Sequence, residues 1–303
     1  MTVAARHVAL IRPGAAEAQS DDTYEVDDCF GSDLGTAEAY KRVLHPSVRS
    51  VVDGFNAAAL AVGCTGSGKS TLLHGRSGDG TARLAIKALF EALHNKAAHV
   101  GLALSQHKAS GGGGAAMEFA VDASFCEVYQ ERCRDLFVNE PKEGAKASAN
   151  QGYLEVEETA DDGWHASGLT FRSAPDAAAL QEFYASALTN RATGLSEYGH
   201  SKHDRAASIL TLRISQYIPA LGGTGGPGGG GSGGAANAST PAQHLVSTIV
   251  IADTPGAEPL AMDPGVLRLR EGARLNRAVT ALASVGPARC DKVRETTQTH
   301  GNK

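Results

Sequence analysis

Short apolar runs of strand length alternate along the chain with stretches in which apolar side chains recur every three to four residues. The runs predict β-strands over residues 7–11, 57–63, 119–129, 208–217 and 245–252. The helical period predicts α-helices over residues 37–52, 81–94 and 180–188. Strands that alternate with helices in this way are typical of an α/β fold with a parallel or mixed central sheet.

Two glycine-rich segments interrupt this pattern. Residues 105–116 contain a run of glycines, and residues 219–241 consist mainly of Gly, Ala and Ser, so neither segment is expected to pack. A chain of 303 residues, 42% of them hydrophobic, can bury one large core. We therefore expect one domain over residues 1–288 with two disordered insertions, followed by a polar tail over residues 289–303.

Charge and cysteine content narrow the class of protein. The net charge of −5 argues against a protein that coats nucleic acid. Five cysteines without a CxxC pair are typical of reduced thiols in an intracellular protein. We expect a cytoplasmic protein, because the sequence shows no apolar core of a signal peptide and no apolar run as long as a membrane span. The sequence also contains no heptads typical of a coiled coil.

Residues 63–70, GCTGSGKS, match the phosphate-binding pattern GxxxxGK[ST] at every fixed position. In this pattern the glycines let backbone N–H groups turn towards phosphate oxygens, the lysine neutralises the β- and γ-phosphates, and the serine hydroxyl can ligate Mg²⁺. A chance match is the alternative in so glycine-rich a chain. The apolar run before the loop and the helix-compatible residues after it favour a nucleotide site. Its predicted members are Gly63, Cys64, Thr65, Gly66, Ser67, Gly68, Lys69 and Ser70.

A P-loop also needs an acidic group at the end of a neighbouring strand to hold the hydrated Mg²⁺. Asp253 follows the apolar run 245–252 and is the candidate for this role, with Ser70 as the other metal-site residue. Gly256 would place a backbone N–H near a γ-phosphate, where it could sense hydrolysis. An ordinary strand-to-turn Asp-Thr-Pro-Gly is the alternative explanation of this segment taken alone.

The same two elements also suit a GTPase, which reads guanine through an N/T-K-x-D element. The chain offers Asn95-Lys96-Ala97-Ala98, which lacks the acid, and Asn302-Lys303, after which the given sequence stops. We therefore expect ATP as the nucleotide and keep a P-loop GTPase as an alternative.

Several segments, in order along the chain, resemble the kinesin motor domain. They are VVDGFNAAALAVGCTGSGKSTLLHG (51–75), SFCEVYQERCRDLF (124–137), NRA (190–192), IADTPGAE (251–258) and EGARLNRAVTAL (271–282). The resemblance implies a P-loop NTPase with a kinesin-like mixed sheet flanked by helices, ATP and Mg²⁺ as ligands, microtubules (tubulin) as partner and a cytoskeletal location. It also implies that Arg205 and Glu258 form the ion pair that closes the active site, and that Pro13 belongs to the segment that holds adenine.

The chain departs from the family pattern at positions that bear on activity. Ala206 stands where the family has a serine that contacts Mg²⁺, and Pro255 stiffens a segment that must move. Near the base, Leu10 replaces an arginine and Thr71 replaces an aromatic residue, which weakens stacking. We therefore predict nucleotide binding with slow hydrolysis.

The segment after Ala288 has no counterpart of the family's H-x-P-Y-R-x-S-K-L-T element, last core strand or neck linker. The resemblance therefore implies a motor fold that is incomplete at its C-terminal end. A missing strand would leave an edge of the central sheet unpaired.

The predicted helix after residue 270 has two opposed faces. Arginines lie on one face and apolar side chains on the other: Arg270, Arg274 and Arg277 against Leu275, Val279 and Leu282. Such a face could lie against an acidic surface, which in the family is tubulin. A solvated amphipathic helix is the alternative.

These features predict an ATP-binding, kinesin-like motor module that couples ATP hydrolysis to microtubule binding and movement. Gly256 would act in hydrolysis together with Arg205 and Glu258. The alternative is a non-motile pseudo-motor that serves as a structural microtubule-binding part.

Overall fold

The computed structural model describes most of the predicted core. The described residues are 7–9, 23–31, 33–75, 79–107, 116–138, 153–160, 163–191, 205–220, 241–256, 272–274, 276–277 and 280–281. Predictions that rest on other residues, including the bulk of both glycine-rich segments and the polar tail, lie outside this part of the chain.

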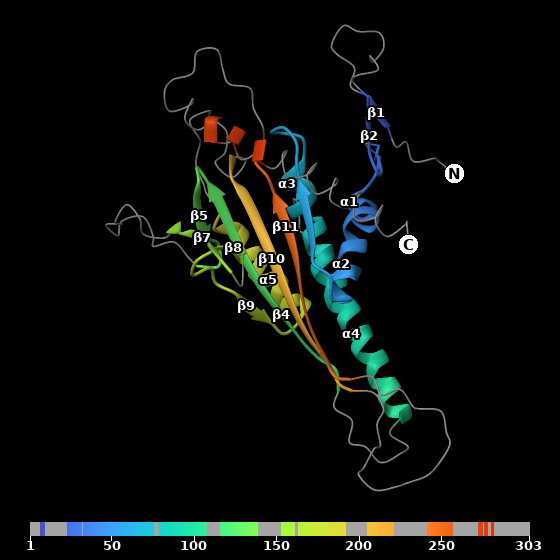
Figure 1. The fold of residues 1–303 in the computed structure, drawn as a ribbon. Coiled ribbons are helices and arrows are strands. Elements are labelled where there is room, and N and C mark those ends of the chain that lie inside the picture. The colour runs from blue at the N-terminus through green and yellow to red at the C-terminus, as the bar shows by residue number, and fades with distance from the viewer. Residues whose placement is uncertain are drawn as a thin grey trace, which may run out of the picture.

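A mixed sheet forms the centre of the molecule (Figure 1). Its strands run in the order β3 (Ala57–Ala61), β11 (Gln243–Asp253), β10 (Ala207–Ile218), β4 (Glu118–Tyr129), β5 (Arg132–Asp135) and β6 (Tyr153–Leu154), and β9 (Arg172–Ala174) also pairs with β4. β3 and β11 are parallel, whereas the other neighbours are antiparallel. The register pairs Asp253 with Ala61, so the last residue of β11 lies beside the strand end from which the P-loop begins.

The helices are α1 (Thr36–Ala39), a π-helical segment over Tyr40–Leu44, α2 (His45–Val52), α3 (Lys69–His74), α4 (Thr81–His107) and α5 (Ala177–Thr189). The π-helical segment directly precedes α2, whose second residue, Pro46, has no N–H to donate to the preceding turn. Asp176 caps the N-terminus of α5, and its side chain accepts a hydrogen bond from the N–H of Ala179 at 2.8 Å.

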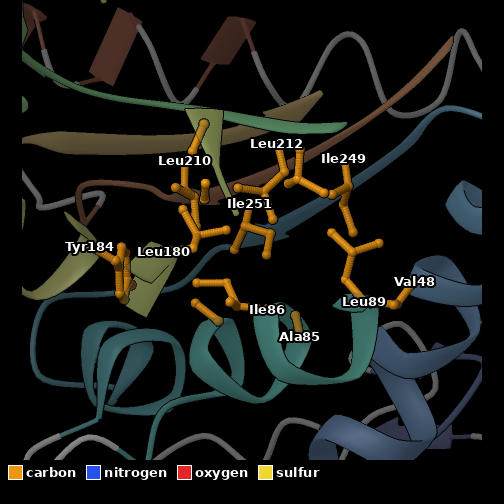
Figure 2. Close-up of a cluster of buried hydrophobic side chains, with 14 of the residues drawn as sticks. Val48, Ala85, Ile86, Leu89, Leu180, Tyr184, Leu210, Leu212, Ile249 and Ile251 are labelled. Carbon is orange, nitrogen blue, oxygen red and sulfur yellow. The ribbon is translucent and has the colours of Figure 1, made fainter. Parts of the chain in front are cut away.

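One face of the sheet packs against α2, α4 and α5 (Figure 2). Alternate residues of the central strands β10 and β11 point into this core, among them Leu210, Leu212, Ile249 and Ile251. Opposite them lie helical side chains, among them Val48, Ile86, Leu89, Leu180 and Tyr184. This layer of helices on a sheet buries one continuous apolar cluster.

The predicted strands and helices are present, with changes at their ends. The expected α/β architecture with a mixed central sheet is confirmed. The helix predicted over residues 81–94 extends to His107, so residues 105–107 are helical and the prediction that they belong to a loop is wrong. Alanine and leucine, which favour helix, continue through residues 97–104 and explain the extension. β3 ends at Ala61, earlier than predicted, because the chain turns into the P-loop.

The strand predicted at residues 7–11 is present as β1 (His7–Ala9), which pairs with β2 (Thr23–Glu25), a strand that was not predicted. β7 (Val156–Thr159) and β8 (Gly163–Ala166) were not predicted either and form a separate antiparallel pair. In the described part of the chain β3 lies at an edge of the central sheet, and the expectation that a missing strand leaves an edge unpaired stays a prediction. Within the described residues, no helix combines the length and the apolar character needed to cross a membrane.

Candidate nucleotide site

The P-loop connects the end of β3 to the start of α3. The predicted residues 63–70 lie consecutively in this turn and in the first residues of the helix. Gly66 and Gly68 have φ values of 81° and 93°, in the left-handed region that favours glycine. Gly63 has a φ of 157°, and a Cβ there would lie 2.9 Å from Ser67 Oγ, so a side chain at this position would also be strained. The three glycines therefore shape a turn whose backbone N–H groups are available to an anion.

Lys69 lies along the inside of the loop. Its Nζ donates hydrogen bonds to the carbonyl oxygens of Gly63 at 2.9 Å and Cys64 at 2.7 Å. The ammonium group is thus held next to the cradle by neutral acceptors. A phosphate oxygen is a stronger acceptor for an ammonium group than a carbonyl, because the hydrogen bond is then charge-assisted on both sides.

Ser70 and Asp253 meet although 183 positions separate them in the sequence. Ser70 Oγ donates to Asp253 Oδ2 at 2.6 Å, and this hydrogen bond links α3 to the end of β11. Asp253 Oδ1 is buried and has no hydrogen-bond partner among the described residues. A buried carboxylate oxygen in that position calls for a cation or a water molecule. A hydroxyl and a carboxylate are also the oxygen donors that Mg²⁺ prefers, so the residues present fit this ion.

A buried charge cluster extends from Asp253 away from the P-loop. Arg191 Nη1 lies 3.7 Å from Asp253 Oδ2, and Arg191 Nε donates to Glu127 Oε1 at 3.3 Å. Arg134 Nη2 donates to the other oxygen of Glu127 at 2.8 Å. Glu127 is only 1% exposed, so both arginines offset the cost of burying its charge. The sequence contains Glu127 and Arg191 in two of the segments that resemble kinesin, but the contact between them could not be predicted.

Two more side chains complete the surroundings of Asp253. His74 Nε2 lies 3.3 Å from Asp253 Oδ2, and His74 Nδ1 lies 2.5 Å from the hydroxyl of Tyr184. Burial raises the pKa of Asp253, but hydrogen bonds from His74 and Ser70, together with the charge of Arg191, outweigh it. The pKa of Asp253 therefore lies below its ordinary value, and the group is an anion at neutral pH. No sequence pattern indicated His74.

The segment after Asp253 is held to the strand of the P-loop. The N–H and the hydroxyl of Thr254 both donate to the carbonyl oxygen of Ala61, at 3.2 Å and 2.8 Å. Pro255 and Gly256 are buried next to this contact. The structure therefore brings the predicted γ-phosphate sensor to the same end of the sheet as the P-loop.

The remaining predicted residues are only partly described. Arg205 is 1% exposed, and Ala206 beside it is equally buried. Glu258, the predicted partner of Arg205, lies outside the described residues, as do Pro13 and Arg270.

Arg274 and Arg277 lie against the turn between β4 and β5. Arg277 Nη1 donates to Glu131 Oε1 at 2.8 Å, and Arg274 Nε lies 3.6 Å from Glu131 Oε2. The turn residues Gln130 and Glu131 have φ values of 50° and 65°, as a tight two-residue hairpin turn requires. Both arginines remain partly exposed, at 41% and 74% for Arg274 and Arg277.

The fold and the site define a P-loop nucleotide-binding protein of the α/β class. A profile of the kinesin motor domain matches residues 8–299, and the chain belongs to the kinesin motor domain family.

The relatives are distant and longer. Kinesin-like protein 6 of Schizosaccharomyces pombe is 26% identical over 273 residues, which cover 89% of this chain and 31% of that protein. KIP3 of Saccharomyces cerevisiae is 26% identical over 266 residues, covering 87% of this chain and 28% of that protein. The chain thus spans about a third or less of the length of these relatives.

Solved structures share the fold. A KIF14 dimer with AMP-PNP in complex with a microtubule matches 91% of this chain and 68% of that chain, with a TM-score of 0.67 and 20% identity. A fast kinesin matches 84% of this chain and 60% of that chain, with a TM-score of 0.59 and 18% identity.

Proposed function

We propose that the chain is an ATP·Mg²⁺-binding, microtubule-associated motor module of kinesin type. The observation that carries the proposal is the 2.6 Å hydrogen bond between Ser70 and Asp253 beside a P-loop of the required shape. Two oxygen donors from distant parts of the chain meet where the carboxyl ends of two parallel strands, β3 and β11, lie side by side. In open α/β sheets this edge is where ligands bind.

Each residue of the site has a proposed role. The backbone N–H groups of the P-loop and the Lys69 ammonium would hold the phosphates, and Lys69 would exchange its contacts with loop carbonyls for contacts with phosphate oxygens. Ser70 and Asp253 would hold Mg²⁺, which when bound neutralises charge on the β- and γ-phosphate oxygens. The buried position of Gly256 suits the sensing of a γ-phosphate, and Arg205 with Glu258 would close the site.

The proposed partner is the microtubule. One structural neighbour, KIF14, is bound to a microtubule, and this chain carries two partly exposed arginines at positions that the family resemblance places towards tubulin. Arg274 and Arg277 already pair with a carboxylate, Glu131, so this surface is able to hold acidic groups. A cytoskeletal location follows from such a partner.

A non-motile pseudo-motor is the second candidate, and two observations favour it. Ala206 is buried where the family resemblance requires a hydroxyl, and Thr254 holds the start of the following segment with two hydrogen bonds to Ala61. Both features reduce hydrolysis more than they reduce binding, because hydrolysis requires an additional Mg²⁺ contact and motion of that segment.

Calorimetry with ATP·Mg²⁺ tests nucleotide binding directly. Lys69→Ala should weaken binding by about 10- to 100-fold, because a charge-assisted hydrogen bond to phosphate is lost. Lys87→Ala is the matched control, since Lys87 is an exposed lysine of α4 that lies 3.9 Å from Glu91 and away from the P-loop. Absence of binding by the unmodified chain, or equal binding by both variants, would refute the proposal.

Two further measurements separate the alternatives. The exposed thiol of Cys64 lies in the P-loop, so bound ATP should slow its alkylation and locate the nucleotide. Phosphate release that rises on addition of microtubules supports the motor, whereas binding to microtubules without release supports the pseudo-motor. Displacement of a fluorescent ATP analogue by GTP more readily than by ATP would support a GTPase.

A further inference from the structure

His74 lies at the end of α3, where four elements meet. The residue is 11% exposed as a side chain, and its ring packs against Tyr184 of α5 and Phe125 of β4, with centroids 6.0 Å and 6.4 Å apart. Its nitrogen Nε2 lies 3.3 Å from both Asp253 Oδ2 of β11 and Ser208 Oγ of β10. A histidine so placed contacts α5, β4 and β10 and also the carboxylate of Asp253.

The surroundings fix which nitrogen carries hydrogen. An ionised carboxylate can only accept hydrogen bonds, so Nε2 must carry a hydrogen that it donates to Asp253. The Tyr184 hydroxyl lies 2.5 Å from Nδ1, and burial raises the pKa of Tyr184 above its ordinary value, so this hydroxyl keeps its proton and can donate to Nδ1. Nε2 therefore carries a hydrogen, and the ring is held between Asp253 and the Tyr184 hydroxyl.

Tyr184 cannot easily turn away from this contact. Its side chain is fully buried, its ring lies 5.3 Å from that of Phe125, and the guanidinium carbon of Arg83 lies 5.6 Å from its centroid. The end of α3 is also held, because the N–H of Gly75 donates to the carbonyl oxygen of Thr71 at 3.0 Å. Both the histidine backbone and its hydrogen-bond donor are therefore held in place.

We infer that His74 is a positioning residue for the metal site: it holds Asp253 through Oδ2, together with Ser70, and so directs the other carboxylate oxygen, Oδ1, towards the bound cation. Oδ2 receives the contacts of Ser70 and His74, and Oδ1 is buried without a hydrogen-bond partner among the described residues. This division leaves one oxygen of the carboxylate for a metal. The inference rests on the proposed ATP·Mg²⁺ function.

The test compares Mg²⁺ dependence in variants of the full chain. ATP affinity is measured by calorimetry in EDTA and at increasing Mg²⁺. His74→Ala should weaken the Mg²⁺ affinity of the ATP complex by about 10- to 100-fold, as is usual when a group that orients a metal ligand is removed. Affinity for ATP in EDTA, which depends on Lys69 and the loop, should stay as in the unmodified chain.

Conservative variants keep the test decisive if His74→Ala folds poorly. His74→Gln retains an N–H donor at the end of the side chain and should restore most of the Mg²⁺ affinity. Tyr184→Phe removes only the hydroxyl that orients the ring and should give an intermediate loss. His94→Ala, on α4, removes a histidine that contacts the carbonyl of Phe90 instead and should leave the Mg²⁺ affinity unchanged.

A spectroscopic measurement is independent of nucleotide. In ¹⁵N NMR of the nucleotide-free chain, Nε2 of His74 should carry a hydrogen, and Asp253→Asn should weaken that preference. The Nδ1–H tautomer, or equal Mg²⁺ dependence for His74→Ala and the unmodified chain, would overturn this inference alone. Failure of the unmodified chain to bind ATP·Mg²⁺ would overturn the proposed function, and this inference with it.

Discussion

Arg191→Ala should destabilise the fold far more than removal of a typical surface arginine. Arg191 lies between two buried carboxylates, with Nε 3.3 Å from Glu127 Oε1 and Nη1 3.7 Å from Asp253 Oδ2. The three side chains are 8%, 1% and 2% exposed, so water cannot replace the lost cation. The substitution would leave both carboxylates with less compensation for their burial.

The loss of stability expected for Arg191→Ala follows from these contacts and their burial. Breaking a buried ion pair by removing one partner costs about 3–5 kcal/mol. Arg134 still donates to Glu127 at 2.8 Å, and the 3.7 Å contact of Arg191 with Asp253 is longer than a hydrogen bond, so we expect the lower end, about 3 kcal/mol. For a domain of a few hundred residues this corresponds to a fall in Tm of about 6–12 °C.

Urea and thermal unfolding at pH 7 measure the effect, and Arg42→Ala is the matched control. Arg42 also has two carboxylate partners, Asp28 at 3.5 Å and Glu38 at 3.4 Å, but its side chain is 44% exposed. Its loss should cost less than about 1 kcal/mol. If Arg191→Ala were no more destabilising than Arg42→Ala, the reasoning about the buried cluster would be wrong.

Three other predictions concern the site and its surface. The pKa of Asp253 is lower in the folded chain than in the unfolded chain. Its ionised form therefore stabilises the fold above the unfolded pKa, and this contribution is lost as pH falls through the folded pKa. Between pH 7 and pH 3, urea unfolding should show a smaller fall in stability for Asp253→Asn than for the unmodified chain. Gly68→Ala has open space for its Cβ but must keep a φ of 93°, so the strain should cost about 1–2 kcal/mol in the same assay. Glu131→Gln removes the carboxylate that pairs with Arg274 and Arg277. The free energy of unfolding should change by less than about 1 kcal/mol, and co-sedimentation with microtubules should increase. Decreased co-sedimentation would contradict the proposed role of these arginines.

The apolar and polar pattern predicted the long strands of the core and missed several short elements. β10 alternates buried with less buried positions, and β11 does so over residues 245–251, which leaves a clear signal in the sequence, whereas β4 is buried continuously over residues 123–127. β7 (VEET) is exposed at every position and β8 (GWHA) pairs with it outside the main sheet, so burial imposes no pattern on this hairpin. The cross-strand contact of Glu157 with His165 at 3.6 Å becomes visible only in the structure.

The same distinction holds for the candidate site. The P-loop could be found because its chemistry depends on neighbouring residues in a fixed spacing, and Asp253 because it ends the most strand-like run. His74 and Tyr184 lie 110 positions apart, and Arg191 and Glu127 lie 64 apart. Such pairs depend on which strands and helices the topology brings together, and a single sequence does not contain that information.

Binding and turnover depend on different parts of this site. The groups proposed to hold phosphate, Lys69 and Ser70, belong to a glycine-shaped loop and to the first turn of α3, so they need little rearrangement to bind an anion. The proposed sensor, Gly256, follows a residue that is held to the last carbonyl of β3 by both its N–H and its hydroxyl. Motion of Gly256 requires these contacts at Thr254 to break, which binding alone does not. Substitutions that abolish hydrolysis are therefore expected to leave nucleotide affinity intact. Binding depends on the preformed geometry of the P-loop, whereas hydrolysis depends on the release of Thr254.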